Sequence, residues 1–302
     1  IIICTVFAYY VQIRTAPYPS VRFGIKKDPQ SKVIFWGILV AFILFAGLRS
    51  KYNDTSTYMY GFSIIETNDL SWKSFSEPYG GFDIYQKLIK LYISDNPQVF
   101  IFLSSVLTNL LYLVFLTRHT SKYAETIFLY AIGSFTFGMA GIKQAIAVGI
   151  SLYAIEAYLN KKYIRAILIL LLAMTFHPYV ICLICVPLLK GRIWSGKTFA
   201  VIVVCIIAFY NMETVFKLFS LIGRDYSETS FDDYTINPIR VMVESVPIII
   251  SVIYRDKLNR SNNKLLCLGI NMRIISFVFV AMGLFMNPIY LGRMATYFDC
   301  LS

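Results

Sequence analysis

The sequence predicts an all-α, polytopic integral membrane protein, and its composition and its repeated apolar runs are the two observations that predict it. The 302 residues are 57% hydrophobic and only 15% charged, whereas soluble domains carry about 25% charged residues. The mean hydropathy is +0.63. Too little polar surface is present to cover a water-soluble globule, and apolar runs between short polar interruptions are typical of spanning helices.

The apolar runs mark the expected helices in chain order. A spanning helix needs roughly 20 predominantly apolar residues. The first run, 1–13, is too short to span comfortably. Helices are expected at 33–48, 98–117, 124–141, 145–159, 199–211, 238–254 and 265–286. We expect about ten transmembrane or half-membrane helices in a single transmembrane domain, residues 1–302.

The positions of Lys and Arg orient these helices, because short cytoplasmic loops are enriched in both. The basic segment 14–32 is expected inside, which places 49–96 and 212–237 outside as the two long external loops. The chain opens with Ile1 rather than Met and stops at Ser302 just as a new apolar segment starts. We therefore expect both termini to be truncated.

The apolar run 164–189 is long enough for one crossing, but a single crossing would place the basic segments 190–197 and 255–264 outside. A break at His177-Pro178 returns both segments to the cytoplasmic side. Proline favours such a break, because it lacks a backbone donor and disfavours helical geometry at the preceding residue. We expect a helical hairpin here, with two short helices that meet near the outer face.

The two external loops are not simple linkers. In the first, apolar residues recur at helical spacing from Ile84 to Tyr92, with Lys87 and Lys90 on the other side. This pattern predicts a short amphipathic helix lying at the membrane interface. The second loop contains GRDYSETSFDDYT, whose acids and aromatic residues suit sugar contact as well as solvent.

The charge and the cysteines exclude several classes of function. The formal charge is +11, but the basic residues lie in short clusters between spans rather than on one domain, so nucleic-acid binding is not expected. Cys182 and Cys185 form a C-x-x-C inside an apolar run, without a second pair or a suitable histidine. Inert thiols are favoured over a redox or zinc site. No ligand spacing demands a metal.

Polar residues gather at the expected external ends of the helices and in the external loops. Ionisable groups near membrane depth are costly and are usually paired or functional. The set comprises Arg49, Tyr52, Asp54, Tyr58, Glu77, Asp83, Lys143, Gln144, His177, Arg224, Asp225 and Arg293. Cations and a histidine beside carboxylates and tyrosines predict a site for an anionic headgroup such as a pyrophosphate, since Arg binds phosphate by a planar fork and Lys as a point charge.

Each of the main candidates also has an ordinary structural interpretation. Arg49 and Arg293 fit anchors that extend to the lipid headgroups. Lys143 fits a cap in a turn whose small residues allow close helix packing. His177 fits a satisfied core histidine, and Asp54 fits the N-cap of a following helix. The combination on one face, rather than any single residue, favours a functional site.

The order of the motifs resembles the EpsG family of bacterial exopolysaccharide and capsule proteins, which is related to the Wzy polymerases. The motifs are GLRSKYNDTSTYMYGF, EPYGGFDIYQKLI, AGIKQAIAVGISLYA, KKYIRA, AMTFHPYVI and LGRMATYF, and they run through nearly the whole chain. Lys143-Gln144 stands where the family usually has Arg-Gln, which keeps the charge but loses bidentate geometry. Asp54 keeps its register although the family's Gly-x-Asp-Thr is here Tyr-Asn-Asp-Thr.

The resemblance implies a polymerase that joins oligosaccharide repeat units carried on undecaprenyl diphosphate into capsular polysaccharide, exopolysaccharide or O-antigen chains. It implies a GT-C-like fold, similar to multispanning glycosyltransferases with lipid-linked donors, in the bacterial cytoplasmic (inner) membrane with the active face external. The implied partners are the lipid-linked oligosaccharide, the bilayer and other polysaccharide-assembly proteins such as a flippase and a chain-length regulator. No nucleotide sugar is needed, because the diphosphate leaving group already sits on the lipid, and no cofactor is expected.

The roles implied for the candidate residues follow from this chemistry. Cations aimed at the leaving group supply the larger electrostatic contribution, and a positioned base adds about 10²- to 10⁴-fold. The implied binding residues for the diphosphate are Arg49, Lys143 and Arg293. The implied base that activates the acceptor hydroxyl is His177 or Asp54. The candidates for substrate contact are Gln144, Glu77, Asp83 and Tyr58.

Other classes of membrane protein compete with this assignment. A transporter or flippase would also have many spans and buried polar residues, but transporters often show repeated halves around a midplane site. This sequence shows no repeat, and its polar residues cluster at one face. An O-antigen ligase-type transferase shares the lipid-linked setting. A membrane acyltransferase is disfavoured, because His177 lacks the acidic neighbour of an H-x-x-x-x-D pattern.

Overall fold

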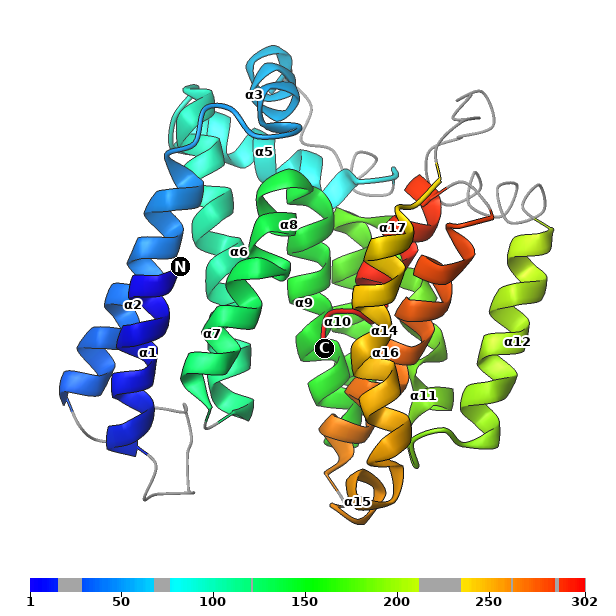
Figure 1. Cartoon of the computed structure of the whole chain (residues 1–302). Helices are drawn as coiled ribbons and strands as arrows, with labels where there is room; N and C mark the ends of the chain where they lie inside the picture. Colours follow the sequence, from blue (N-terminus) through cyan, green and yellow to red (C-terminus); the bar gives the residue numbers. More distant parts are fainter. Residues whose placement is uncertain are drawn as a thin grey trace. The chain divides into compact units, whose positions relative to one another are not determined.

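The computed structural model describes residues 1–15, 29–67, 77–120, 122–211, 235–261, 263–285 and 288–301. All regular structure in these ranges is helical (Figure 1), which confirms the all-α prediction. Of the expected loop 212–237, only 235–237 lie within them, so Arg224, Asp225 and most of the acidic and aromatic motif lie outside the described residues. Most of the basic segment 14–32 also lies outside the described residues.

Three helices in these ranges are long and apolar enough to cross a membrane, namely α6 (Pro97–His119), α9 (Ile142–Leu159) and α16 (Lys264–Met282). Shorter apolar stretches lie in α1 (Ile2–Thr15), α2 (Pro29–Gly47), α10 (Tyr163–Phe176) and α12 (Gly196–Tyr210). These helices support a membrane protein, as the composition predicts.

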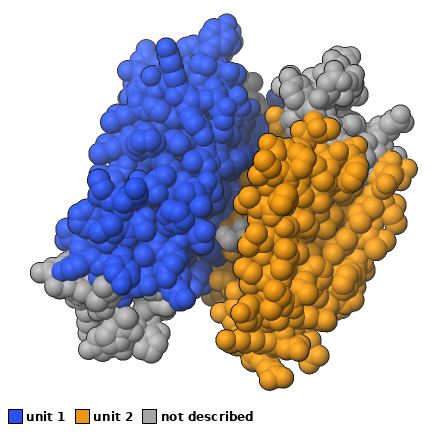
Figure 2. Space-filling view, viewed as in Figure 1, with its two compact units in different colours: residues 1–153, 175–177 blue, residues 154–174, 178–302 orange. Residues whose placement is uncertain are grey.

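The chain divides into two compact units, which Figure 2 shows in blue and orange. Unit 1 comprises Ile1–Tyr153 and Thr175–His177, and unit 2 comprises Ala154–Met174 and Pro178–Ser302. Helices α9 and α10 therefore contribute residues to both units. The single transmembrane domain, residues 1–302, stays a prediction.

Unit 1 is built from α1, α2, α6 and the first part of α9, together with α3 (Thr55–Ile64), α5 (Gly80–Tyr92), α7 (Tyr123–Ile132) and α8 (Ser134–Ala140). Helix α2 packs on α6, and α1 packs on α2 and α7. Figure 1 shows α3 and α5 at the end of unit 1 where α2 ends and α6 begins. Apolar side chains of α3, α5, α6 and α9 form a core there, in which the Phe62 and Phe100 rings stack with centroids 4.9 Å apart.

The end of α2 packs closely against the start of α6 and is hydrogen-bonded to it. A side chain at Gly47 would place its Cβ 2.7 Å from the Phe102 ring and 3.2 Å from the Phe102 Cα. The Gln98 side chain then donates from Nε2 to the carbonyl oxygens of Gly47 (2.7 Å) and Arg49 (3.2 Å). These bonds satisfy carbonyl groups that have no partner within α2. The polar residues that follow α2 are thus held at one end of unit 1.

Two expectations for unit 1 are wrong in detail. The single helix expected over 124–141 is two helices, because Gly133 adopts a non-helical φ of −108° and ψ of −96° between α7 and α8. Lys143 was expected in a turn, but Gly141 alone connects α8 to α9, and Lys143 lies in the first turn of α9.

The helix expected in the first long loop is confirmed as α5, but its basic residues face the protein rather than water, and its position at the membrane interface stays a prediction. Lys87 is only 9% exposed, and its Nζ lies 2.9 Å from Asp83 Oδ2. Lys90 donates from Nζ to three carbonyl oxygens, those of Phe62, Ser63 and Ile65, at the end of α3. The apolar residues Leu88, Leu91 and Tyr92 are the exposed ones.

Unit 2 contains most of α10, then η1 (Pro178–Cys185), α11 (Val186–Leu189), α12, α14 (Pro238–Ile253), α15 (Arg255–Arg260), α16 and α17 (Pro288–Phe298). Helices α12, α14 and α17 each pack on α16. The predicted break at His177-Pro178 is confirmed, since α10 ends at Phe176 and the chain resumes as the 3₁₀ helix η1. The second arm of this break is a 3₁₀ helix followed by one short α-helix.

Candidate functional site

Three segments that lie far apart in the sequence meet around Tyr79 in unit 1. The Lys143 Nζ atom lies 4.7 Å from the centroid of the Tyr79 ring and 5.4 Å from that of the Phe82 ring. The Tyr79 ring meets the His177 ring edge-on, with centroids 5.3 Å apart and an interplanar angle of 82°. A cation over an aromatic face is attracted by the ring quadrupole. We call Tyr79, Lys143 and His177 the Tyr79 cluster.

The backbone before α5 explains how Tyr79 reaches this position. Tyr79 precedes the first residue of α5 and adopts the left-handed conformation, with φ of 67° and ψ of 12°. This region is uncommon for an aromatic residue and costs of order 1–3 kcal/mol. Strain of this kind persists only where the surrounding structure holds it, and it concentrates at functional sites.

Close packing of α5 on the end of α10 supplies that support. A Cβ at Gly81 would lie 2.1 Å from Thr175 Oγ1 and 3.2 Å from the Thr175 carbonyl carbon, so glycine is required at this contact. Thr175 precedes His177 by two positions, and the contact therefore sets the Tyr79 ring against the imidazole. Within unit 1, the EPYGGFD motif thus packs against Thr175 and His177 of the AMTFHPYVI motif.

His177 lies at the break between α10 and η1 and is 7% exposed. Pro178 ends the helical geometry at this point. The burial agrees with the core-histidine interpretation, while the contact with Tyr79 places the imidazole beside the ring that also faces Lys143. Both interpretations are therefore compatible with its position.

Lys143 and Gln144 occupy the first turn of α9, where Lys143 is half-buried and Gln144 is 6% exposed. A lysine at a helix N-terminus is electrostatically unfavourable, because the macrodipole already places partial positive charge there. The same combination favours an anion, which both the N-terminal end of the helix and the ammonium would stabilise. This turn has the electrostatics of a phosphate site.

The expected carboxylates differ in their surroundings. Asp83 pairs with Lys87 on α5, so its charge is compensated locally. Glu77 is exposed, and its carbonyl oxygen accepts a bond of 2.9 Å from Gly80 N at the start of α5. Asp54 is exposed at the N-cap position of α3, as the alternative interpretation expected, but its side chain makes no capping bond. Glu77 is the carboxylate nearest in sequence to Tyr79.

Tyr58 packs toward the cluster from α3. Its ring is half-buried and lies 6.1 Å, centroid to centroid, from the Phe82 ring at an angle of 68°. Phe82 is 2% exposed and also faces the Lys143 ammonium. Tyr58 is thus linked to the cluster through Phe82.

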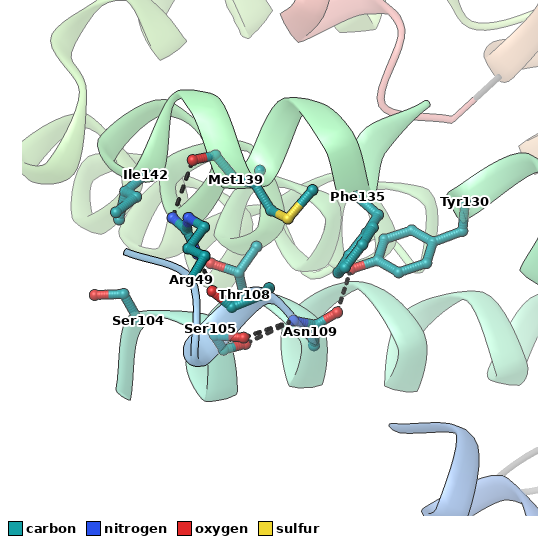
Figure 3. A pocket seen from close by; sticks show the side chains of 11 residues that line it. Arg49, Ser104, Ser105, Thr108, Asn109, Tyr130, Phe135, Met139 and Ile142 are labelled. Carbon is teal, nitrogen blue, oxygen red and sulfur yellow. Dashed lines mark hydrogen bonds between the residues drawn. The ribbon is translucent and has the colours of Figure 1, made fainter. Parts of the chain in front are cut away.

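Arg49 turns inward rather than toward lipid headgroups. Its Nε donates to Thr55 Oγ1 (3.1 Å), its Nη1 to the Ala46 carbonyl and its Nη2 to the Met139 carbonyl (2.9 Å). The guanidinium thereby joins the end of α2, the start of α3 and the end of α8, and Figure 3 shows it directed at Met139. Burial lowers the pKa of Arg49 to about 10, which leaves it charged at neutral pH.

Arg49 also lines a cavity of about 10 Å³ with polar residues of α6 and with Tyr130 (Figure 3). Below it, Tyr130 Oη donates to Asn109 Oδ1 (2.8 Å), and Asn109 Nδ2 donates to the Ser105 carbonyl (2.8 Å). A volume of roughly 10–15 Å³ holds about one water molecule. The cavity therefore has no room for a sugar or a diphosphate.

Arg293 belongs to α17 in unit 2. It is exposed, whereas its neighbours Leu291, Met294 and Ala295 are buried. The guanidinium thus extends from the solvent- or lipid-facing side of α17.

Sequence reasoning missed Tyr79, although a tyrosine directly before the Gly80-Gly81 pair was the available signal. The cysteines that the structure describes are all free thiols. Within the described ranges, no group of three or more His, Cys, Asp or Glu side chains is arranged to hold a metal ion.

Comparison with known proteins gives one match. A model of the EpsG family matches residues 32–301. No curated protein and no solved structure matches the chain. The matched range includes every segment that builds the Tyr79 cluster, as well as α17 with Arg293.

Proposed function

Since the chain belongs to the EpsG family, we propose that it is a polysaccharide polymerase that joins oligosaccharide repeat units carried on undecaprenyl diphosphate. The family is generally polysaccharide polymerase-like, which supports a membrane transferase of polysaccharide biosynthesis. The observation that carries the proposal is the Tyr79 cluster, in which a lysine at the N-terminus of α9 and a histidine face the same aromatic ring.

Lys143 binds the diphosphate of the donor in this proposal. The ammonium and the N-terminus of α9 both favour negative charge, and their effect grows as the diphosphate leaves. The Tyr79 and Phe82 rings hold the ammonium in place, because an aromatic face attracts a cation.

His177 accepts the proton of the acceptor hydroxyl. The hydroxyl oxygen forms a bond to the anomeric carbon of the donor chain, and the bond from that carbon to the diphosphate breaks. The proton passes to the imidazole, and the electron pair of the broken bond leaves with the lipid diphosphate. Histidine is the commonest general base, and the Tyr79 ring contact orients it. Asp54 is the second candidate base.

Arg49 takes a structural role, because three of its N–H groups are bonded within the protein and the cavity beside it is too small for a diphosphate. Arg293 stays the second candidate cation for the diphosphate, on account of its exposure on α17 and its place in the LGRMATYF motif. Glu77 is the favoured carboxylate for sugar hydroxyls, since Asp83 is paired with Lys87.

The proposal places the Tyr79 cluster at the external face of the bacterial cytoplasmic membrane, in a GT-C-like fold of about ten spans. The distribution of cations supports this sidedness. Gln98 at the start of α6 contacts the end of α2, whereas Arg118 lies in the last turn of α6, at its opposite end. Cations accumulate on the cytoplasmic side, so the start of α6 and the cluster near it face outward.

An assay with purified protein and a lipid-linked repeat unit tests the proposal, with polymer ladders as the readout. Lys143→Ala should abolish the ladder, while Lys143→Arg, which restores the usual residue of the family, should retain it. Lys122→Ala is the matched control, since this exposed lysine precedes α7 at the opposite end of unit 1. Full-length ladders from Lys143→Ala would refute the diphosphate assignment. Wild-type protein that moves the lipid-linked unit without ladders would indicate a flippase.

A further inference from the structure

Unit 2 contains charged side chains at the middle of an apolar helix. Arg273 lies near the centre of α16, one of the helices long and apolar enough to span a membrane. Its Nη2 pairs with Glu244 Oε2 on α14, and its Nη1 pairs with Asp299 Oδ1, directly after α17. We call Glu244, Arg273 and Asp299 the Arg273 triad.

The triad is partly buried, and the planar guanidinium of Arg273 pairs with both carboxylates at once. The Arg273 side chain is 13% exposed, Glu244 23% and Asp299 43%. Charges at membrane depth are costly unless they are paired. Because the two Nη atoms of one planar group serve carboxylates from two different segments, a lysine cannot replace it. Arg240 adds a weaker contact, with its Nε 3.8 Å from Glu244 Oε1.

Apolar contacts hold α17 on α16 as well, but they are less specific. The Phe279 and Phe298 rings lie 5.6 Å apart, centroid to centroid. A Cβ at Gly269 would lie 3.1 Å from the Leu301 carbonyl oxygen, which shows how closely the chain after α17 approaches α16. Apolar burial is non-directional, whereas a slip of α17 by one turn would leave Asp299 without Arg273.

Arg293 depends on the same register. It lies on α17 about 9 Å along the helix axis from Asp299, at a rise of 1.5 Å per residue. Asp299 N bonds to the Ala295 carbonyl oxygen (3.0 Å), so the last turn of α17 is continuous with the residue that pairs with Arg273. A fixed Asp299 therefore fixes the position of Arg293 along α16.

We propose that Arg273, with Glu244 and Asp299, is a positioning residue that sets the register of α17 on α16 and thereby places Arg293 for the donor diphosphate. The consequence for polymerisation rests on the proposed function, in which Arg293 binds the diphosphate. The effect of the triad on the register of α17 does not depend on that function.

The test uses Asp299→Asn in the full chain, because Arg273 then keeps Glu244 as a partner and the buried charge stays compensated. Asp256→Asn is the matched control, an exposed carboxylate on α15. Two quantities are measured on protein purified in membrane-mimetic discs. These are amide hydrogen exchange over 288–301, and the polymerisation rate as a function of the concentration of the lipid-linked donor.

Asp299→Asn should accelerate exchange over 288–301 and leave exchange in α12 unchanged. It should also raise the KM for the donor about 10-fold, since small misplacements of a binding group have effects of that size or more. In an Arg293→Ala background it should raise the KM no further, because both substitutions then remove the same interaction. Asp256→Asn should change neither quantity.

Unchanged exchange over 288–301 would overturn the positioning of α17. A KM effect that multiplies with that of Arg293→Ala would overturn the action through Arg293. A normal donor KM for Arg293→Ala itself would instead refute the diphosphate role of Arg293 in the proposed function, and the exchange result would then decide the register of α17 by itself.

Discussion

The ring of Tyr79 lies edge-on to the ring of His177, with the two centroids 5.3 Å apart. Tyr79 precedes α5, whereas His177 follows α10, so this contact joins two segments that are remote in sequence. The same Tyr79 ring lies under the Lys143 ammonium. One aromatic side chain therefore organises the cation and the base that the proposed chemistry requires.

Removal of the Tyr79 ring should slow polymerisation without unfolding the protein. Tyr79→Ala loses a cation–π contact of about 1 kcal/mol, and it also removes the ring that contacts the His177 imidazole. We expect a rate loss of roughly fivefold or more, measured as initial ladder formation. Tyr79→Phe keeps the ring and should stay close to wild type. Equal losses from both substitutions would show that the hydroxyl group, and not the ring, does the positioning.

The close approach at Gly81 should tolerate no side chain. Gly81→Ala would place a Cβ 2.1 Å from Thr175 Oγ1, and overpacking of this kind typically costs about 1–3 kcal/mol. We expect a lower thermal midpoint in detergent together with reduced activity. Gly61→Ala on α3 is the control, because open space surrounds its Cβ, and it should be neutral or stabilising. A stable, active Gly81→Ala would contradict the packing described.

Apolar length predicted most helices, since the ability to span is a local property of the sequence. The runs at 98–117 and 265–286 became α6 and α16. The break at His177-Pro178 was also predictable, because proline limits the residue before it. The break at Gly133 was not, because a single glycine inside an apolar helix is usually tolerated.

Contacts between remote segments could not be predicted. Nothing local indicates that Lys90 turns inward to the last carbonyls of α3, or that Arg49 bonds to the Met139 carbonyl. In the sequence, Arg273 is visible only as a charge inside the apolar run 265–286. Its partners Glu244 and Asp299 come from other helical segments and appear only in the folded unit.

Lys90 should contribute to stability rather than to catalysis. Its Nζ donates to three carbonyl oxygens at the C-terminal end of α3, at 2.7 to 3.1 Å. Lys90→Met leaves these acceptors without the ammonium, and we expect a loss of about 1–3 kcal/mol in the free energy of unfolding. The exposed Lys51 provides a control, and Lys51→Met should leave the stability unchanged. A wild-type thermal midpoint for Lys90→Met would rule out the capping role.

We expect substitution of Arg49 to affect mainly stability and substitution of Lys143 to affect mainly activity. Arg49→Lys keeps the charge but cannot reproduce a planar fork that reaches Thr55, Ala46 and Met139. We therefore expect Arg49→Lys to lower the thermal midpoint, by about 1–3 kcal/mol of unfolding free energy, while the surviving folded protein keeps a normal KM for the donor.

Lys143→Ala should behave in the opposite way, with a thermal midpoint close to wild type and a strong loss of polymerisation, because its ammonium lies over the Tyr79 and Phe82 rings and is assigned to the donor diphosphate. Thermal melts and donor titrations on the same preparations compare the two variants directly. If Arg49→Lys raised the donor KM at unchanged stability, Arg49 would have to be assigned to diphosphate binding. The small cavity beside it would then have to open during turnover.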